Sequence, residues 1–341
     1  MHTDLDRRTF VERALALLGA AGAAGASAAA GTESTPAPST PRQPTLRFFP
    51  GFKAIRIQTR EALINGVMGG AGPPVLLLHG FPQSHVQWRT IAQALAQDYT
   101  VVATDLRGYG DSSKPADGEN HAGYSKRATA ADQVEVMRQL GFDRFAVVGH
   151  DRGGRVGHRL ALDHPAHVKQ LAVLDIVPTY KLYSNVTKEF ATAYYHWFLL
   201  IQPSPLPETL IGNSAQFYLE SRFLRRPVGG TAAMAPEAVA EYLRCFKDPA
   251  TLHAMCEDYR AAAGIDLEHD QADLDKKVEC SLLALWGGKA FMERLFAVAD
   301  TWRERATRVE GKALPGGHWL TEQLPDLVSA ELRTFLSRPA S

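Results

Sequence analysis

One short run, Gly149–Gly154, constrains the fold of this chain more than any other feature of its sequence. The run reads Gly-His-Asp-Arg-Gly-Gly. It joins the apolar segment Phe145–Gly149, predicted as a buried strand, to Gly153–Leu162, predicted as a helix. The glycines around Asp151 permit a sharp turn in which larger side chains would collide with the neighbouring strand and helix. A strand that turns directly into a helix indicates an α/β fold with a mostly parallel sheet.

Strand-like and helix-like segments alternate on both sides of this turn. The other short apolar runs, which are typical of buried strands, are Val75–Leu78, Tyr99–Thr104, Val168–Leu174, Ser281–Trp286 and Val309–Leu314. Helices are predicted around Trp88 and Ile91, over Ala130–Leu140, near Phe291–Arg305 and at the carboxyl end. This order predicts a parallel sheet flanked by helices.

Residues 178–275 break the alternation. They show helical periodicity, several prolines and many aromatic residues, and no clear buried strand. We therefore expect a helical lid inserted into an α/β core formed by residues 46–177 and 276–341. A lid over a sheet places a ligand pocket between the two parts, which is a common location for an active site.

The spacing Gly-x-nucleophile-x-Gly matches the nucleophile elbow and predicts the α/β-hydrolase fold, with Asp151 as the nucleophile. The elbow raises its central side chain above the sheet, beside the positive end of the following helix. A carboxylate is already ionised at neutral pH, so it can attack a saturated carbon without a base and form an ester on the enzyme. Hydrolysis of that ester by water then requires a base.

The base of this fold comes late in the chain. His318 is the candidate, because Gly316–Trp319, Gly-Gly-His-Trp, follows the last predicted strand. The acid that orients it has two candidate positions. The loop after Ser281–Trp286 contains no carboxylate, and the nearest one, Glu293, is expected on a helix. We choose Asp175, directly after the strand that precedes the lid, where a capping role is the alternative.

Backbone N–H groups of Phe81 and Arg152 are the candidates for an oxyanion hole. They would stabilise the tetrahedral intermediate that forms when water attacks the ester of Asp151. The side chains of Arg152 and Arg155 flank the nucleophile. Such a pair suits bidentate binding of a substrate carboxylate and offsets its repulsion from Asp151. The alternative is that one arginine pairs with an acid of the protein.

Four runs of this sequence resemble the fluoroacetate and haloacetate dehalogenases. They are His150–Arg155, Tyr195–Trp197, Cys256–Arg260 and Gly317–His318. The similarity covers the core and the lid, roughly residues 46–340. The resemblance implies that haloacetate, such as fluoroacetate or chloroacetate, is hydrolysed with water to glycolate and halide. It also implies no cofactor and suggests a homodimer.

The resemblance also implies the role of each site residue. Asp151 would be the nucleophile, His318 the base and Asp175 its partner, and Arg152 and Arg155 would hold the substrate carboxylate. The lid residues that would donate hydrogen bonds to the leaving halide are His196, Trp197 and Tyr259. Converging donors suit this role, because leaving fluoride without hydrogen bonds in a dry site is costly.

Three other functions fit parts of the sequence. An epoxide hydrolase shares the fold and the aspartate, but it needs two lid tyrosines, and the arginine pair suits an anion better than a neutral epoxide. The candidate tyrosines are Tyr259 with Tyr180, Tyr183, Tyr194 or Tyr195. A haloalkane dehalogenase usually carries an aromatic residue after the nucleophile, where this chain has Arg152. A protein that only binds small acids would not need His318 and Asp175.

Charge and cysteine content exclude several other classes. Lys and Arg total 37 and Asp and Glu total 37, so the chain carries no broad basic face for nucleic acid. The three cysteines, Cys245, Cys256 and Cys280, are interpreted as free thiols, with a Cys245–Cys256 bridge as the alternative. None has the spacing of metal ligands, and the acidic run Asp266–Asp270 is interpreted as a solvated lid turn. We therefore expect no metal site.

The first 45 residues are expected to lie outside the fold. Residues 1–30 resemble a twin-arginine signal peptide, with Asp6–Val11 carrying the arginine pair and an Ala/Gly/Leu stretch ending in small residues. Residues 31–45, rich in Pro, Ser and Thr, are interpreted as a flexible linker. This predicts a periplasmic protein that the twin-arginine translocation machinery exports.

Overall fold

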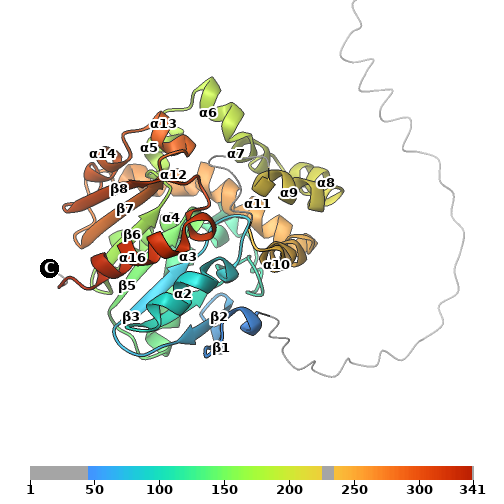
Figure 1. Cartoon of the computed structure of the whole chain (residues 1–341). Helices are drawn as coiled ribbons and strands as arrows, with labels where there is room; N and C mark the ends of the chain where they lie inside the picture. Colours follow the sequence, from blue (N-terminus) through green and yellow to red (C-terminus); the bar gives the residue numbers. More distant parts are fainter. Residues whose placement is uncertain (1–44, 225–233, 340–341) are drawn as a thin grey trace, which may run out of the picture. The chain divides into compact units, whose positions relative to one another are not determined.

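The structure, a computed structural model, describes residues 45–224 and 234–339. Within these residues, eight strands form one sheet in the order β1-β2-β4-β3-β5-β6-β7-β8 (Figure 1). The strands are β1 (Lys53–Gln58), β2 (Leu63–Gly69), β3 (Pro74–Leu78), β4 (Thr100–Thr104), β5 (Phe145–His150), β6 (Val168–Leu174), β7 (Ser281–Gly287) and β8 (Val309–Leu314). The predicted mostly parallel sheet is confirmed, because β4, β3, β5, β6, β7 and β8 all pair in parallel.

The hairpin of β1 and β2 was not assigned from the sequence. These two strands pair antiparallel, and β2 also pairs antiparallel with β4, at one edge of the sheet. Lys53, Arg56 and Gln58 of β1 are exposed and only Ile55 is buried, so its sequence, Lys-Ala-Ile-Arg-Ile-Gln, lacks the continuous apolar run of a buried strand. The predicted signal peptide and almost all of the predicted linker lie outside the described residues, but Thr45 is buried and η1 follows it.

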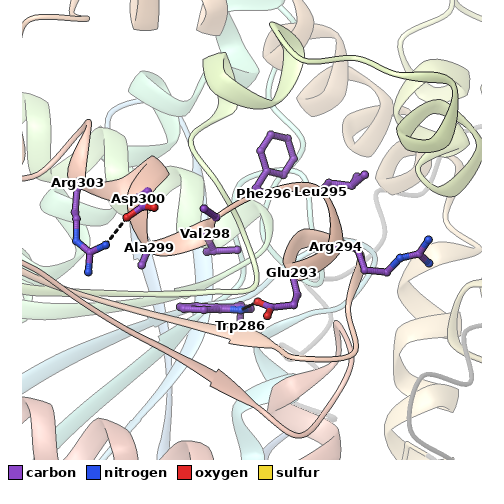
Figure 2. A pocket seen from close by; sticks show the side chains of 10 residues that line it. Trp286, Glu293, Arg294, Leu295, Phe296, Val298, Ala299, Asp300 and Arg303 are labelled. Atoms are coloured by element: carbon purple, nitrogen blue, oxygen red, sulfur yellow. Dashed lines mark hydrogen bonds and ion pairs between the residues drawn. The ribbon is translucent and has the colours of Figure 1, made fainter.

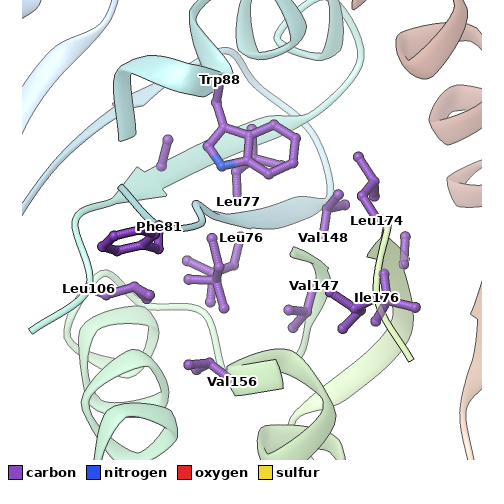
Figure 3. Close-up of a cluster of buried hydrophobic side chains, with 14 of the residues drawn as sticks. Leu76, Leu77, Phe81, Trp88, Leu106, Val147, Val148, Val156, Leu174 and Ile176 are labelled. Carbon is purple, nitrogen blue, oxygen red and sulfur yellow. The ribbon is translucent and has the colours of Figure 1, made fainter. Parts of the chain in front are cut away.

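Helices cover the sheet. Those of the core are α2 (Arg89–Leu95), α3 (Lys126–Gln139), α4 (Arg152–Asp163), α13 (Phe291–Leu295), α14 (Val298–Arg303), α15 (Leu320–Gln323) and α16 (Pro325–Leu336), with the 3-10 helices η1 (Leu46–Phe48), η2 (His85–Trp88) and η3 (Glu119–Tyr124). α2 packs against α16, and α3 packs against α4, which contacts β3, β5 and β6. Figure 3 shows Trp88 and Val156 on opposite sides of the strands that carry Leu76, Leu77 and Val147. The buried core therefore fills both faces of the central strands.

The helical lid lies between β6 and β7. Its helices are α5 (Thr179–Tyr183), α6 (Lys188–Ala193), α7 (Tyr195–Leu200), α8 (Leu206–Gly212), α9 (Ala215–Leu224), α10 (Pro236–Phe246), α11 (Pro249–Ala263) and α12 (Ile265–Ala272). The predicted inserted helical region is confirmed. α11 is its centre, since it contacts α7, α8, α10 and α12 within the lid and η3 of the core (Figure 1).

Two predicted helices differ from the structure at their ends. α3 begins at Lys126 rather than Ala130, because the Ser125 hydroxyl caps it by accepting a hydrogen bond from Ala128 N at 3.1 Å. The segment near Phe291–Arg305 forms two short helices, α13 and α14, because the backbone is extended at Phe296. None of the helices described here is long and apolar enough to span a bilayer.

Candidate active site

The turn between β5 and α4 has the geometry of an elbow. Asp151 lies at its apex with φ 48° and ψ −115°, and its side chain is buried. A Cβ on Gly149 would lie 2.4 Å from the Gly153 carbonyl oxygen, and one on Gly153 would lie 2.3 Å from the Leu78 carbonyl oxygen. Only glycine fits at both positions, because these neighbours are backbone atoms that cannot move aside. The predicted strand, sharp turn and helix are confirmed.

The two carboxylate oxygens of Asp151 face different partners. Oδ1 accepts a hydrogen bond from the Phe81 N–H at 3.1 Å, and Oδ2 lies 3.9 Å from His318 Nε2. Gly80, beside Phe81, lets the loop after β3 approach, because a Cβ there would lie 2.5 Å from the Asp151 Cβ. The Arg152 N–H lies at the start of α4, next to the nucleophile in the chain. Oδ2 is thus the oxygen that faces the candidate base.

His318 is held from behind by Asp175. Its Nδ1 lies 2.6 Å from Asp175 Oδ2, and both side chains are buried. The other oxygen, Asp175 Oδ1, accepts a hydrogen bond from the Gly287 N–H at the end of β7, at 2.9 Å. Glu293 instead accepts a hydrogen bond from Trp286 Nε1, beside an open cavity of about 550 Å³ (Figure 2). The structure therefore brings Asp175, and not Glu293, to the candidate base.

The surroundings favour the ionised form of Asp151. Burial alone would raise the pKa of Asp151, but the positive charges of His318, His150 and the two nearby arginines outweigh burial and lower the pKa. Burial lowers the pKa of His150 itself to about 4. At neutral pH the permanent positive charges beside the carboxylate are therefore those of Arg155 and Arg152.

His150, the residue before the nucleophile, has a role that its sequence position did not predict. Its ring is buried, its Nε2 donates to the His318 carbonyl oxygen at 2.9 Å, and the two rings are 4.8 Å apart. Because its pKa lies near 4, this imidazole is neutral at pH 7 and acts as a hydrogen-bond donor rather than a charge. His150 thus fixes the loop that carries the candidate base.

The two arginines are held differently. Arg152 donates from Nε to Asp258 Oδ2 and from Nη2 to the Asp258 carbonyl oxygen, both at 2.6 Å, so this arginine does pair with an acid of the protein. Arg155 donates from Nη1 to the Val177 carbonyl oxygen at 3.0 Å and to Thr179 Oγ1 at 2.9 Å. Within residues 45–224 and 234–339, Arg152 Nη1 and Arg155 Nε are buried and have no hydrogen-bond partner.

Lid aromatics close over these guanidinium groups. Arg152 stacks on the Tyr259 ring at 4.2 Å and Arg155 on the Trp197 ring at 4.8 Å, and the two rings are 5.6 Å apart. Trp197 Nε1 and the Tyr259 hydroxyl are buried and likewise lack a partner in the described part of the chain. Burial, together with the charge of Asp151, raises the pKa of Tyr259 well above its ordinary value, so the phenol keeps its proton.

His196 completes the predicted set. Its ring lies 5.9 Å from that of Tyr259 and stacks on Phe81 at 6.0 Å, and its Nε2 lies 3.1 Å from Arg222 Nη2. The structure therefore gathers the predicted site residues, which come from six separate stretches of the chain, around Asp151. The site combines a buried carboxylate with converging N–H and O–H donors.

Sequence reasoning missed the acid that positions Arg152. Asp258 lies on α11, and besides Arg152 it accepts from the Tyr109 hydroxyl at 2.8 Å and pairs with Lys126. The attraction of these cations holds the pKa of Asp258 well below its ordinary value, despite its burial. The sequence did contain one signal for this role, because Asp258 is a carboxylate directly before Tyr259 in a predicted lid helix.

The interpretation of Asp266–Asp270 as a solvated turn was wrong. These residues lie in α12, and both end residues are buried. Asp266 accepts from the Lys126 N–H at 2.8 Å, and Asp270 pairs with Arg159 at 2.8 Å. Cations of α3 and α4 bind this acidic run, because the lid packs directly on the core.

The chain matches the family model of the alpha/beta hydrolase fold over residues 73–323. It therefore belongs to the α/β hydrolase family, and the predicted α/β-hydrolase fold is confirmed. A solved structure of an alpha/beta hydrolase from Nostoc sp PCC 7120 is 56% identical with a TM-score of 0.82, covering 84% of this chain and 98% of that one.

Two curated relatives narrow the type of hydrolase. Fluoroacetate dehalogenase from Burkholderia sp is 47% identical over 85% of this chain and 95% of its own length. Soluble epoxide hydrolase from Corynebacterium sp. (strain C12) is 34% identical over 80% of this chain and 94% of its own length. The chain is thus a hydrolase of this fold, related to both a dehalogenase and epoxide hydrolases.

Proposed function

We propose that this hydrolase cleaves the carbon–halogen bond of haloacetate, fluoroacetate or chloroacetate, and yields glycolate and halide. One observation carries the proposal. Within residues 45–224 and 234–339, four buried donors near Asp151 have no partner: Arg152 Nη1, Arg155 Nε, Trp197 Nε1 and the Tyr259 hydroxyl. Buried donors without partners are costly, so they indicate a ligand that supplies acceptors. A haloacetate supplies carboxylate oxygens as acceptors for the two arginines and a halogen as the acceptor for Trp197 and Tyr259.

The first step is displacement. Arg152 Nη1 and Arg155 Nε bind the substrate carboxylate, and Asp151 Oδ2 donates an electron pair to the carbon that bears the halogen. The carbon–halogen bond breaks as the new carbon–oxygen bond forms, and the halide leaves with the bonding pair. Trp197, Tyr259 and His196 stabilise the halide, because N–H and O–H donors replace its lost hydration.

The second step is hydrolysis of the carboxymethyl ester. His318 Nε2 takes a proton from water, and the hydroxide attacks the Asp151 carbonyl carbon. The negative charge develops on Oδ1, to which the Phe81 N–H already donates, and the N–H of Arg152, the next residue in the chain, is the second proposed donor. Collapse of the intermediate expels glycolate, whose alkoxide takes the proton from His318, and the Asp151 carboxyl that is regenerated loses its remaining proton to water. Asp175 stabilises the imidazolium in between.

An epoxide hydrolase is the second candidate. The Tyr183 hydroxyl, like that of Tyr259, is buried without a partner in the described chain, and the rings of both lie against Trp197 at 5.2 Å and 5.6 Å. Two phenols can polarise an epoxide oxygen. The arginine donors favour the haloacid, because a neutral epoxide would leave Arg152 Nη1 and Arg155 Nε unsatisfied.

Halide release and diol formation separate the two candidates. The purified chain would be assayed with fluoroacetate, chloroacetate and styrene oxide under the same conditions. We expect halide from the two acids and little diol from the epoxide. Fast diol formation without halide release would instead identify an epoxide hydrolase.

The covalent step has its own test. His318→Ala should release halide in a single burst and retain a carboxymethyl group on Asp151, detected by mass spectrometry of the peptide that carries it. Asp151→Asn, mixed with the same chloroacetate, is the matched control and should gain no mass. An unmodified His318→Ala enzyme that nonetheless turns over would exclude the ester mechanism.

A further inference from the structure

A second cluster of ionisable side chains lies between the lid and the core. Asp117 and His121 come from the loop that contains η3, and His253 and Glu257 lie four residues apart on α11, so they share one face of that helix. One ligand atom of each of Asp117, His253 and Glu257 lies within 4.8 Å of the others. A cavity of about 460 Å³ opens beside them and is lined by all four residues. The helices α8 and α11 lie next to each other here (Figure 1).

Each histidine of the cluster has a ring nitrogen within hydrogen-bond distance of a carboxylate. His253 Nε2 lies 3.3 Å from Asp117 Oδ1, and His121 Nδ1 bonds to Glu257 Oε2. We propose that these two imidazoles and two carboxylates form a binding site for one divalent transition-metal ion of the zinc type. The dication would take the place of these two hydrogen bonds and bind each imidazole in its neutral form, through the ring nitrogen that carries no proton. Two nitrogens and two oxygens suit a tetrahedral Zn²⁺.

The residues behind the proposed ligands are arranged as metal sites require. Glu208 Oε1 lies 3.0 Å from His253 Nδ1, so the second ring nitrogen, Nε2, is left to face Asp117 and the cluster. A carboxylate that holds the back of a histidine fixes the tautomer and raises the basicity of the metal-binding nitrogen. Arg260 Nη1 holds both Glu208 Oε1, at 2.7 Å, and Glu257 Oε1, at 2.6 Å, and so leaves Glu257 Oε2 to the cluster.

Charge and distance both fit a dication. The carboxylates of Asp117, Glu208 and Glu257 bring three negative charges, and Arg260 brings one positive charge, which leaves two negative charges when both imidazoles are neutral. Ligands about 2.1 Å from a tetrahedral zinc lie roughly 3.4 Å apart. The ligand atoms of Asp117, His253 and Glu257, which lie within 4.8 Å of one another, therefore need to approach by up to roughly 1.4 Å, a movement within reach of side chains bordering a cavity. The bound ion would join lid helix α11 to the core loop.

Sequence reasoning expected no metal site, and the reason it missed this one is physical. His121 and Glu257 are 136 positions apart, and neither pair alone has a recognisable ligand spacing. Only packing of α11 against η3 brings the two pairs together. The site is independent of the proposed dehalogenation, since none of its ligands touches Asp151 in the described structure.

Zinc binding to the untagged, chelator-stripped chain tests the proposal. Titration with Zn²⁺ against a chromophoric competitor should give one tight site per chain. His253→Ala should weaken it at least 100-fold, and Glu208→Gln by about 10- to 100-fold, because Glu208 orients His253 and adds one negative charge but is not itself a ligand. His167→Ala is the matched control, because this histidine bonds to the Asp143 carbonyl oxygen outside the cluster. Its affinity should equal that of the wild type.

Cobalt reports the geometry, and a loop variant guards against misfolding. Co²⁺ bound to the wild type should give the intense visible absorption of a tetrahedral site, and His253→Ala should lose it. Near-ultraviolet circular dichroism shows whether His253→Ala is folded. If it is not, the loop variant Asp117→Asn replaces it as the deciding variant. The absence of stoichiometric binding, or equal affinity of the deciding variant and His167→Ala, would overturn the proposal.

Discussion

Two buried guanidinium groups beside one carboxylate determine what the site can bind. Arg152 is anchored by two bonds to Asp258, and Arg155 by the Val177 carbonyl oxygen and Thr179. Each keeps one inward N–H without a partner in the described residues. The geometry gives a planar anion two donors from rigid, pre-oriented side chains, so little conformational entropy is lost on binding.

Replacing the guanidinium group of Arg155 by the ammonium group of lysine tests this arrangement. Arg155→Lys keeps the positive charge but cannot donate both to Thr179 and to the substrate. We expect the KM for chloroacetate to rise about 10- to 100-fold, the range for loss of one charged hydrogen bond. Steady-state halide release measures it, with the exposed Arg56→Lys of β1 as control. Equal KM values for the two variants would contradict the proposed carboxylate site.

The lowered pKa of Asp151 makes a prediction about pH. Because the pKa in the folded protein lies below that of the unfolded chain, about 3.9, the ionised side chain contributes stability above that pH, and the contribution is lost as pH falls through the folded pKa. Asp151 is therefore fully ionised in the neutral range. In the wild type, which keeps His318, the burst of halide released in a single turnover of chloroacetate should have the same rate constant from about pH 8 to about pH 5. If the burst rate constant instead falls with a midpoint near pH 6 or 7, the attacking group is not an Asp151 carboxylate with a lowered pKa.

How far the site could be predicted depends on where each residue lies. Asp151 and Asp175 each follow a strand directly, and His318 lies in the loop after the last one, so the parallel sheet brings all three to the same edge. The partner of Arg152 could not be predicted, because Asp258 lies 106 positions away on a lid helix. The local sequence pattern identifies residues near strand ends, whereas the packing of the lid on the core decides which lid and core side chains come into contact.

At the scale of elements, β5 was predictable because all of its residues are buried and its sequence is a mostly apolar run, and α4 because it directly follows the Gly-rich turn at Asp151. β1 was not, since it is an edge strand with one solvated face. The break between α13 and α14 was not visible either, because no proline or glycine marks Phe296. Tertiary packing overrides helix propensity in that segment.

The elbow itself can be tested by adding one methyl group. Gly153→Ala places a Cβ 2.3 Å from the Leu78 carbonyl oxygen, so strand β3 or helix α4 must shift. We expect a loss of about 1–3 kcal/mol in the free energy of unfolding, together with most of the activity. Gly212→Ala in α8 is the matched control, because its Cβ would lie 3.7 Å from Leu252 and helix propensity improves. Chemical denaturation of both variants measures the difference, and similar values would refute the steric argument.

The buried carboxylate of Asp258 on α11 pairs with Arg152 of α4 and Lys126 of α3. Asp258→Asn would leave Arg152 and Lys126 as buried cations with a weakened partner. Breaking such a pair costs about 3–5 kcal/mol, and we expect that loss in urea denaturation. Asp300→Asn breaks the exposed pair with Arg303 in α14 and should cost at most about 1 kcal/mol. Equal losses would mean that the network adds nothing beyond a surface ion pair.

For the whole molecule, the lid and core are fastened by ion pairs and not by disulfides. Cys245, Cys256 and Cys280 are free thiols, as interpreted from the sequence, and the alternative Cys245–Cys256 bridge is not formed. Ion pairs such as Lys126 with Asp258 and Arg159 with Asp270 join the two parts instead. The described fold therefore depends on no disulfide bond.

Export by the twin-arginine route stays a prediction, because residues 1–44 lie outside the described residues. Replacing both Arg7 and Arg8 by Lys should keep the chain in the cytoplasm of a competent host as a folded precursor with unchanged halide release per molecule. The wild type should appear in the periplasmic fraction, shortened at its amino end, and Arg42→Lys with Arg47→Lys, beyond the leader, should behave like it. Fractionation and mass measurement decide. If the Arg7 and Arg8 variant reaches the periplasm as efficiently as this control, the arginine pair is not an export signal.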